Sequence, residues 1–527
     1  MTDAELFVGG RVYTGRRYCD ALLAENGEVV VVGSEAEVRR AAPTGASVHS
    51  LAGALMLPGL IDAHFHVADV TRSREGLDLS GANSIEELAA TVRRWAEDHP
   101  RGPVIGRGWD PERFPGHIWP TRRDIDRVVS DRPAVLAHVS GHAAVVNSSA
   151  LLAAGMEQPT PDPPGGAFGR TSDGALDGRL FDSAIAALEQ RLGPAALPEP
   201  AALVRTLRSA ATLGLTTLGA MSASPEEAVA LREIAAAGTL PGRVRVYLRW
   251  DRWEEYYRLP EGPSGPPGRF SVVGVKAYTD GAFGTRTAWL SEPYADDPSR
   301  SGLAVADDSE LRWLLAKTRE RGLTPALHAI GDRAVAYCLD RLEEVSSNSG
   351  PPARIEHAAL TPPALFSALA RVRPALVVQP GFVWSDYWLA DRLGPERARW
   401  AYAFRSLTDR GHLLVGSSDA PYDPVDPWRG IQAAVHRVDP LGRSANPTAS
   451  EVLTAEEAVR LYTANAGVAW REATLGLLEP GSPADLLVVG SSTLEGAIAA
   501  GSAAVRETWV AGARLVGLQP SPGEQIV

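Results

Sequence analysis

The segment Leu57-Pro58-Gly59-Leu60-Ile61-Asp62-Ala63-His64-Phe65-His66 is the stretch from which the fold can be worked out. An apolar run leaves a Pro-Gly turn and ends in two histidines that are separated by one residue. Side chains at positions i and i+2 of a strand share a face, so both imidazoles would converge on one point. Neutral imidazole is a good ligand for zinc and similar divalent ions. A bare His-x-His pair is a weak signal, and its weight depends on the rest of the chain.

Four more strand-like runs have the same form, because a candidate ligand stands at or just after the end of each one. The runs are residues 270–275, 323–327, 354–356 and 412–416, and they lead to Lys276, His328, His357 and Asp419. A parallel barrel gathers the C-terminal ends of its strands on one face, where barrel enzymes place their catalytic residues. The common placement therefore predicts one site built from five strand ends.

Each of these residues also has a structural explanation when it is taken alone. Lys276 fits a surface lysine or one arm of a buried ion pair. His328 and His357 fit hydrogen-bonded core histidines, and Asp419 fits an ordinary turn carboxylate. Their order along the chain and their shared position favour one site over four unrelated roles.

The alternation of strand-like and helical segments predicts an α/β protein with a (β/α)8 TIM-type barrel over residues 57–469. The expected barrel strands lie at residues 56–63, 215–220, 243–249, 271–277, 324–328, 353–357, 374–379 and 413–418. Helices are expected at residues 309–321 and 333–345. The gap after the first strand is too long for a loop, so residues 70–200 are expected to form an inserted subdomain. Within it, the Pro-, Gly- and Asp-rich residues 159–178 indicate a loop near the barrel mouth.

As a set, these motifs resemble the metal-dependent hydrolases of the amidohydrolase superfamily. That family carries His-x-His on strand one, lysine on strand four, histidines on strands five and six, and aspartate on strand eight. More narrowly, the chain is similar to the branch that contains N-substituted formamide deformylases and related N-acyl hydrolases. The segments that carry this likeness cover almost the whole chain and are residues 141–143, 147–148, 275–288, 328–332, 419–421, 475–476 and 480–486.

The resemblance implies features that the residues alone do not establish. Residues 1–56 and 470–527, whose short apolar segments indicate β-hairpins, would pair into one small β-sandwich beside the barrel. Lys276 would be carboxylated by carbon dioxide, which turns a repelling ammonium into an anion that can bridge two cations. From the ligand types, we expect His64, His66 and Asp419 to hold one metal, and His328 and His357 a second. Zinc is the first expectation for one or two ions, and iron or manganese suits the same ligands.

The expected chemistry is hydrolysis of a non-peptide, amide-like C–N bond in an N-acyl or N-formyl small molecule. A water shared by two cations loses a proton near neutral pH and can attack a carbonyl group. Asp419 is expected to accept that proton and pass it to the leaving nitrogen. His142 is expected to contact the substrate or the oxyanion, with a structural role as the alternative. Metal-assisted isomerisation or decarboxylation, and a non-catalytic metal-binding regulator, remain open as alternatives.

Other residues near the predicted mouth carry weaker signals. Asp280 and Arg286 either shape the mouth or form a salt bridge that orders the loop, and the salt bridge is preferred. Tyr278 and Trp109 either line the pocket or pack in a core. Gln379, at the end of the seventh expected strand, has no assigned role.

The composition agrees with an ordinary enzyme. The chain has 527 residues, of which 45% are hydrophobic, so a full core is available. A formal net charge of −12 argues against a nucleic-acid surface. No apolar run reaches transmembrane length, and the first residues lack a basic leader pattern. We therefore expect a cytoplasmic protein, in composition typical of a bacterium, that acts on a small molecule without nucleic-acid or membrane partners; a homodimer is compatible with this interpretation.

Overall fold

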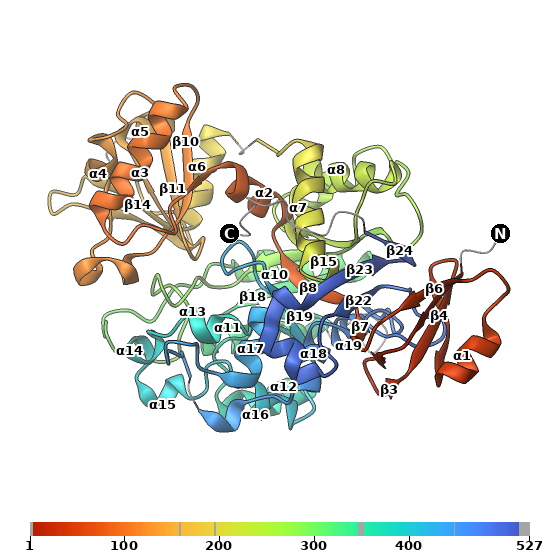
Figure 1. Cartoon of the computed structure of the whole chain (residues 1–527). Coiled ribbons are helices and arrows are strands. Elements are labelled where there is room, and N and C mark those ends of the chain that lie inside the picture. Colours follow the sequence, from red (N-terminus) through yellow and green to blue (C-terminus); the bar gives the residue numbers. More distant parts are fainter. Residues whose placement is uncertain (1–3, 157–159, 194–195, 346–351, 447, 516–527) are drawn as a thin grey trace.

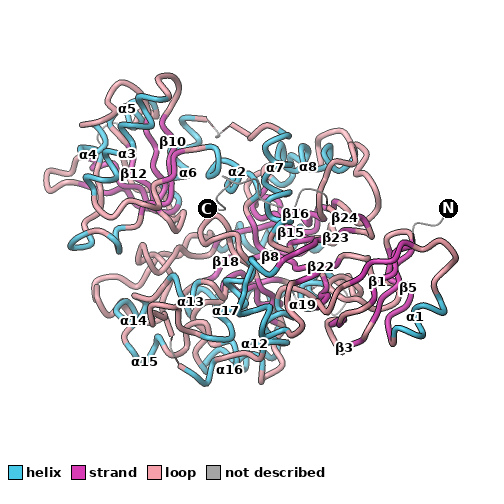
Figure 2. The backbone as a smooth tube through the Cα atoms, viewed as in Figure 1, coloured by secondary structure: helices cyan, strands magenta, loops and turns pink. Residues whose placement is uncertain are grey.

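The computed structural model describes residues 4–156, 160–193, 196–345, 352–446 and 448–515. Its strands form four sheets. Figure 1 shows three regions: a sheet with its own helices at the upper left, a barrel in the centre, and the sheets of the chain ends at the right. Strands gather in the same three regions in Figure 2, where long loops join the elements around the barrel. No helix in the described part of the chain is long and apolar enough to cross a membrane.

The central sheet contains eight strands in parallel register. They are β8 (Leu60–Phe65), β15 (Leu215–Ala223), β16 (Arg243–Arg249), β17 (Phe270–Tyr278), β18 (Thr324–Ala329), β19 (Arg354–His357), β20 (Ala375–Val378) and β21 (Leu414–Gly416). The segment after β21 returns to β8: the Asp419 backbone N–H donates to the His64 carbonyl at 2.9 Å, and Phe65 forms a parallel bridge with Ala420. The predicted (β/α)8 barrel is confirmed.

The first barrel strand begins later than the sequence indicates. Residues 56–58 belong to β7 (Leu55–Pro58), which lies in a different sheet, and β8 starts after Gly59. Pro58 has no backbone N–H to donate, and a Cβ on Gly59 would lie 2.3 Å from Thr216. The chain therefore passes from one sheet to another at Pro58-Gly59, within a single apolar run.

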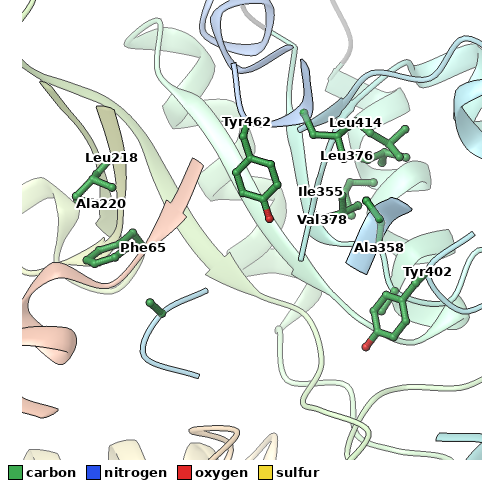
Figure 3. Packing of buried hydrophobic residues seen from close by; sticks show 14 of the residues in the cluster. Phe65, Leu218, Ala220, Ile355, Ala358, Leu376, Val378, Tyr402, Leu414 and Tyr462 are labelled. Atoms are coloured by element: carbon green, nitrogen blue, oxygen red, sulfur yellow. The ribbon is translucent and has the colours of Figure 1, made fainter. Parts of the chain in front are cut away.

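Alternating side chains along the strands fill two layers of core. On β20, Ala375 and Val377 face the barrel interior, whereas Leu376 and Val378 belong to the larger layer between strands and helices. Figure 3 shows Leu376 and Val378 close to Ile355 and Leu414 from the neighbouring strands. Packed apolar side chains thus fill both the interior of the barrel and the layer between its strands and helices.

Helices cover the outside of the barrel. They are α2 (Val67–Glu75), α7 (Pro200–Thr212), α8 (Pro225–Ala236), α9 (Trp253–Tyr256), α10 (Asp308–Glu320), α11 (Asp332–Val345), α12 (Phe366–Val372), α13 (Phe382–Ser385), α14 (Leu389–Leu393), α15 (Pro395–Ala398), α16 (Phe404–Thr408), α17 (Pro427–His436), α18 (Ala455–Leu461) and α19 (Ala464–Trp470). Helix α10 illustrates their design: Asp307 caps the amides of Ser309 and Glu310, while Leu311, Leu314 and Leu315 are buried. Helices α10 and α11 match the two predicted ones.

Strands from both chain ends share one sheet. Its order is β24 (Ala513–Arg514), β23 (Val505–Val510), β22 (Leu486–Val489), β7, β2 (Arg11–Tyr13) and β3 (Tyr18–Cys19), with β7 and β22 antiparallel. The second sheet contains β5 (Glu28–Gly33), β4 (Ala21–Glu25), β1 (Ala4–Val8) and β6 (Ser47–Ser50), with α1 (Glu35–Ala41) beside it; α20 (Leu494–Ala500) lies between β22 and β23 in sequence. Phe7, Met56, Leu486 and Trp509 share a core. Of the residues expected in this β-sandwich, 1–3 and 516–527 lie outside the described residues.

Between α2 and α7 the chain forms a body that we call the inserted subdomain. Its sheet has the order β13 (Gly166–Arg170), β14 (Leu176–Asp182), β12 (Ala143–Val146), β11 (Ala134–His138), β10 (Val104–Trp109) and β9 (Leu77–Asp78), packed with α3 (Ile85–Asp98), α4 (Arg122–Asp126), α5 (Ser148–Ala153) and α6 (Ser183–Leu192). The loop was expected at residues 159–178, of which residue 159 lies outside the described residues. Residues 160–178 contain β13 and the start of β14 instead. Asp173 and Gly174 lie in the turn at residues 171–175, where the Gly174 N–H donates to the Thr171 carbonyl.

A buried ion pair joins this subdomain to the barrel. Arg392 of α14 pairs both with Glu112 of the subdomain and with Asp296 in the long loop after β17. The Arg392 guanidinium also lies over the Trp388 ring, 5.2 Å from its centroid. Because breaking a buried pair is costly, this contact helps to fix the subdomain above the barrel.

Candidate metal centre

The six predicted ligands meet at the C-terminal ends of the barrel strands. They are His64 in β8, His66 just after it, Lys276 in β17, His328 in β18, His357 at the end of β19, and Asp419 beyond β21. All six residues are buried, with no more than 7% of any one exposed. The barrel thus brings together side chains that are far apart in the sequence.

Asp419 lies at the centre of the group. Its Oδ1 atom is 3.1 Å from Nε2 of His64 and 3.1 Å from Nε2 of His66. The Lys276 Nζ atom is 3.4 Å from the same His64 nitrogen. Ligand atoms of His64, His357 and Asp419 all lie within 4.8 Å of one another, which is compact enough for one metal ion. The rings of His328 and His357 are 4.4 Å apart, so His328 adjoins this trio.

Two histidines are oriented by acceptors behind them. His64 Nδ1 lies 2.7 Å from Glu356 Oε2, and His357 Nδ1 lies 2.7 Å from Gln379 Oε1. A carboxylate accepts only, so Nδ1 of His64 donates to Glu356, and Nε2 is the ring atom that faces Asp419. His357 is held in the same way, with Nε2 as its free nitrogen. Acceptors of this kind fix the tautomer of metal-binding histidines.

Of the other two histidines, His328 is oriented by a hydrogen bond and His66 lies only near a carboxylate. His328 donates from Nε2 to the Gly281 carbonyl at 3.0 Å, which leaves Nδ1 free. His66 Nδ1 is 3.8 Å from Asp69 Oδ2, while its Nε2 faces Asp419. His328 and His357 therefore each keep one ring nitrogen free, and His64 and His66 both present Nε2 to Asp419. This donor set fits a divalent cation with nitrogen and oxygen ligands.

Burial and neighbouring charges set the protonation of the group. Burial lowers the pKa of His357 to about 3 and the pKa of His328 well below its usual value, so both rings are neutral. Burial tends to raise the pKa of Asp419, but His64 and His66 outweigh it and hold that pKa well below the usual range. Burial also lowers the pKa of Lys276 to about 8, against the opposing effect of Glu356 and Asp419. Neutral imidazoles and an ionised carboxylate are the forms that bind metal.

The backbone is strained at two of these ligands. His357 has φ 71° and Asp419 has φ 59°, values in the left-handed region that favours glycine. Non-glycine residues persist there only when the surrounding structure compels them, and they cluster at functional sites. The strain at both residues thus supports a functional interpretation of the site.

The structure also places the weaker candidates. His142 lies just before β12, and its ring is 4.9 Å from that of His328. Tyr278 lies beside the centre, where its ring is 4.7 Å from Lys276 Nζ and its hydroxyl is 2.7 Å from Ser222 Oγ. Trp109, by contrast, is fully buried in a core of the inserted subdomain and donates to the Leu136 carbonyl. Trp109 is therefore a packing residue.

Asp280 and Arg286 order the loop after β17 through separate partners. Asp280 accepts hydrogen bonds from the backbone amides of Trp289, Ile330 and Gly331. Arg286 pairs with Asp296 at 2.8 Å. The expected salt bridge between the two is replaced by these contacts, because the Asp280 carboxylate points back to the start of α11 rather than out along the loop.

Comparison with known proteins gives the chain its family. The sequence profile of the amidohydrolase family matches residues 47–516. The chain belongs to the amidohydrolase family. Among its relatives, the amidohydrolase YtcJ of Bacillus subtilis is 36% identical over 91% of this chain and 93% of its own length. The N-substituted formamide deformylase of Arthrobacter pascens is 28% identical over 91% of both chains.

A solved structure supports the same assignment. This amidohydrolase superposes on an uncharacterised metal-dependent hydrolase from Pyrococcus horikoshii with a TM-score of 0.77 and 28% identity. The match covers 92% of this chain and 97% of that one. The similarity extends over the barrel and the added sheets alike.

The orienting residues were not recognised from the sequence of this amidohydrolase. Glu356 and Gln379 each stand near the end of a barrel strand, where a buried polar residue has to serve a purpose. Arg354 and Glu356 are two residues apart in β19, so their side chains point to the same face. Arg354 donates to Glu356 Oε1 at 2.7 Å. Two charged residues at i and i+2 in a buried strand were the available signal.

Proposed function

We propose that this protein is a metal-dependent enzyme that hydrolyses an amide-like C–N bond in a small molecule of N-acyl or N-formyl type. The observation that carries the proposal is that hydrogen-bond acceptors orient His64, His328 and His357, while Nε2 of His64 and Nε2 of His66 both face the Asp419 carboxylate. Membership of the amidohydrolase family supports the reaction class. The likeness to an N-substituted formamide deformylase supports the substrate class.

The metal would be held by the residues whose free atoms converge. One ion would take His64, His66 and Asp419, with His357 close enough to contribute. A second would take His328 and His357 together with Lys276 in carboxylated form. A divalent cation bound here, zinc in the first instance, polarises a carbonyl group and brings the pKa of water toward neutrality.

The lysine environment suits carboxylation. Carbon dioxide reacts with a neutral amine, and the pKa of about 8 that burial gives Lys276 makes the neutral form accessible near physiological pH. The carbamate so formed is an anion. It replaces a cation that would repel bound metal.

Asp419 is the residue placed to move protons. Its Oδ1 atom is shared between two histidines, and its low pKa keeps it ionised at neutral pH. In the proposed reaction Asp419 takes one proton from the attacking water and delivers it to the leaving nitrogen as the C–N bond breaks. One water is consumed, and an acid and an amine are released.

Hydrolysis in oxygen-18 water tests this proposal. Purified enzyme, loaded with zinc, is incubated with a panel of N-substituted formamides and N-acylated amines, and a chelator-treated sample serves as its control. We expect one labelled oxygen in the released acid and no release after metal removal. Metal-dependent turnover that leaves the product unlabelled would indicate isomerisation or decarboxylation and would overturn the proposal.

A further inference from the structure

His142 and Asp182 are neighbours across two strands of the inserted subdomain. Ala143, at the start of β12, pairs with Phe181 of β14, and the Asp182 backbone N–H donates to the His142 carbonyl at 3.0 Å. The two side chains also meet, because His142 Nδ1 is 2.8 Å from Asp182 Oδ1. A carboxylate accepts only, so the proton of the imidazole lies on Nδ1 and Nε2 is the free nitrogen.

Asp182 holds this position in an unfavourable conformation. Its φ is 47° and its ψ is −118°, a combination that suits glycine better than any residue with a Cβ. It stands at the N-terminus of α6, where a carboxylate usually accepts from the first helical amides, yet it makes no such bond. The side chain is 3% exposed, and within the described structure its Oδ2 atom has no hydrogen-bond partner. The carboxylate is thus turned away from its local helix and toward His142.

The pair also reaches the metal centre. A Cβ on Gly281 would lie 2.6 Å from Asp182 Oδ1, so Asp182 packs directly against the loop after β17. The carbonyl of the same Gly281 accepts the hydrogen bond that orients His328. The His142 ring is in turn 4.9 Å from His328. Asp182 therefore contacts His142, whose ring lies beside His328. It also packs against the Gly281 backbone, whose carbonyl orients His328.

We propose that Asp182 is a positioning residue, which fixes the ring and the tautomer of His142 so that Nε2 is presented to the substrate beside His328. The inserted subdomain thereby completes the site that the barrel strands begin. This inference rests on the proposed function, because it assigns His142 to the same hydrolysis. It adds that the substrate-facing atom is Nε2 and that a carboxylate at a strained position controls it.

A set of variants separates positioning from a structural role. Asp182→Asn keeps the shape and one acceptor but removes the charge, whereas Asp182→Gly removes the acceptor and relieves the strained backbone. Asp177→Asn is the matched control, since Asp177 is a buried aspartate on the same strand that bonds to Arg179. Hydrolysis of 4-nitroformanilide is measured for each variant, alone and combined with His142→Asn, together with thermal stability and zinc content.

We expect Asp182→Asn and Asp182→Gly to lower kcat by at least ~10-fold with little change in KM, zinc content or, for the glycine variant, Tm. In the His142→Asn background the same changes should alter kcat by less than about 2-fold, because Asp182 acts through His142. Asp177→Asn should leave kcat unchanged. Full additivity of the Asp182 and His142 effects would overturn the proposal, and so would normal turnover by His142→Asn.

A measurement without substrate keeps this inference independent of the proposed function. In zinc-loaded enzyme carrying nitrogen-15 histidine, the signals that disappear in His142→Asn identify this ring by NMR. We expect the tautomer protonated on Nδ1, and its loss in Asp182→Gly. A ring protonated on Nε2 alone would refute the inference even if the enzyme hydrolyses amides. Failure to hydrolyse any amide, with the expected tautomer present, would instead refute the hydrolytic function.

Discussion

Replacing Glu356 with glutamine should weaken metal binding, although Glu356 itself is not expected to touch the metal. The Glu356 carboxylate accepts from His64 Nδ1 at 2.7 Å and from two nitrogens of Arg354 at 2.7 and 3.0 Å. A glutamine has only one acceptor oxygen for these three donors. If the oxygen stays with His64, the amide NH2 faces the guanidinium. If it turns to Arg354, the amide NH2 opposes the Nδ1 proton and favours the tautomer with a proton on Nε2.

The size of the effect follows from these two outcomes. Loss of an orienting partner usually reduces metal affinity by about 10- to 100-fold. We expect Glu356→Gln toward the upper end, or about 2–3 kcal/mol of binding free energy, because both amide orientations are unfavourable. The free energy of unfolding should also fall, since the fully buried Arg354 loses part of its charged partner.

Zinc affinity is measured by competition with a chromophoric chelator, and stability by urea unfolding. Glu451→Gln is the control, because Glu451 is another buried glutamate that accepts from the backbone amide and hydroxyl of Ser406. We expect the control to lose stability and keep its zinc affinity. Wild-type affinity in Glu356→Gln would show that the His64 orientation does not depend on Glu356, and the reasoning would fail.

Three further predictions concern the ligands themselves. The double variant His64→Ala, His66→Ala should lose bound metal and turnover but keep its circular dichroism spectrum, with the exposed His99→Ala as control; unchanged metal stoichiometry contradicts the assignment. Lys276→Ala should lose activity and regain part of it with acetate or propionate, which can occupy the place of the carbamate; full activity with an unmodified lysine, seen by crystallography of the metal-loaded enzyme, is the opposing result. Asp419→Asn should retain at least one metal ion and lose at least ~10²-fold in turnover, with little change in KM. A near-normal rate would show that another residue relays the proton, and His142 is the next candidate.

Local sequence patterns were sufficient to predict the barrel but not the contacts that tune its site. Apolar runs mark the eight strands, and ligands at their ends indicate where those ends meet, because strand geometry is a local property. The partnership of His64 with Glu356, or of His142 with Asp182, depends on which strands become neighbours in the folded chain. No spacing rule in one sequence carries that information.

The boundaries show the same limit. Pro58 and Gly59 interrupt the apolar run from Leu55 to Phe65, but the first barrel strand was expected from residue 56, so the switch of sheets went unrecognised. The segment around β13 was taken for a loop because its glycines and prolines are typical of loops. Pairing with β14 makes it a strand despite that composition.

The pairing of β7 with β22 has a consequence for how the enzyme is made. Strand β7 leads into the first two histidines, yet one of its neighbours in the sheet is residues 486–489, near the end of the chain. Barrel closure likewise waits for residues 419–420 to reach β8. During synthesis residues 419–420 therefore have to leave the ribosome before β8 gains partners on both edges, and residues 486–489 before β7 does. Contacts so distant in sequence form slowly, and unpaired edges are exposed meanwhile. The candidate metal centre is thus completed only after residues 419–420 have been synthesised.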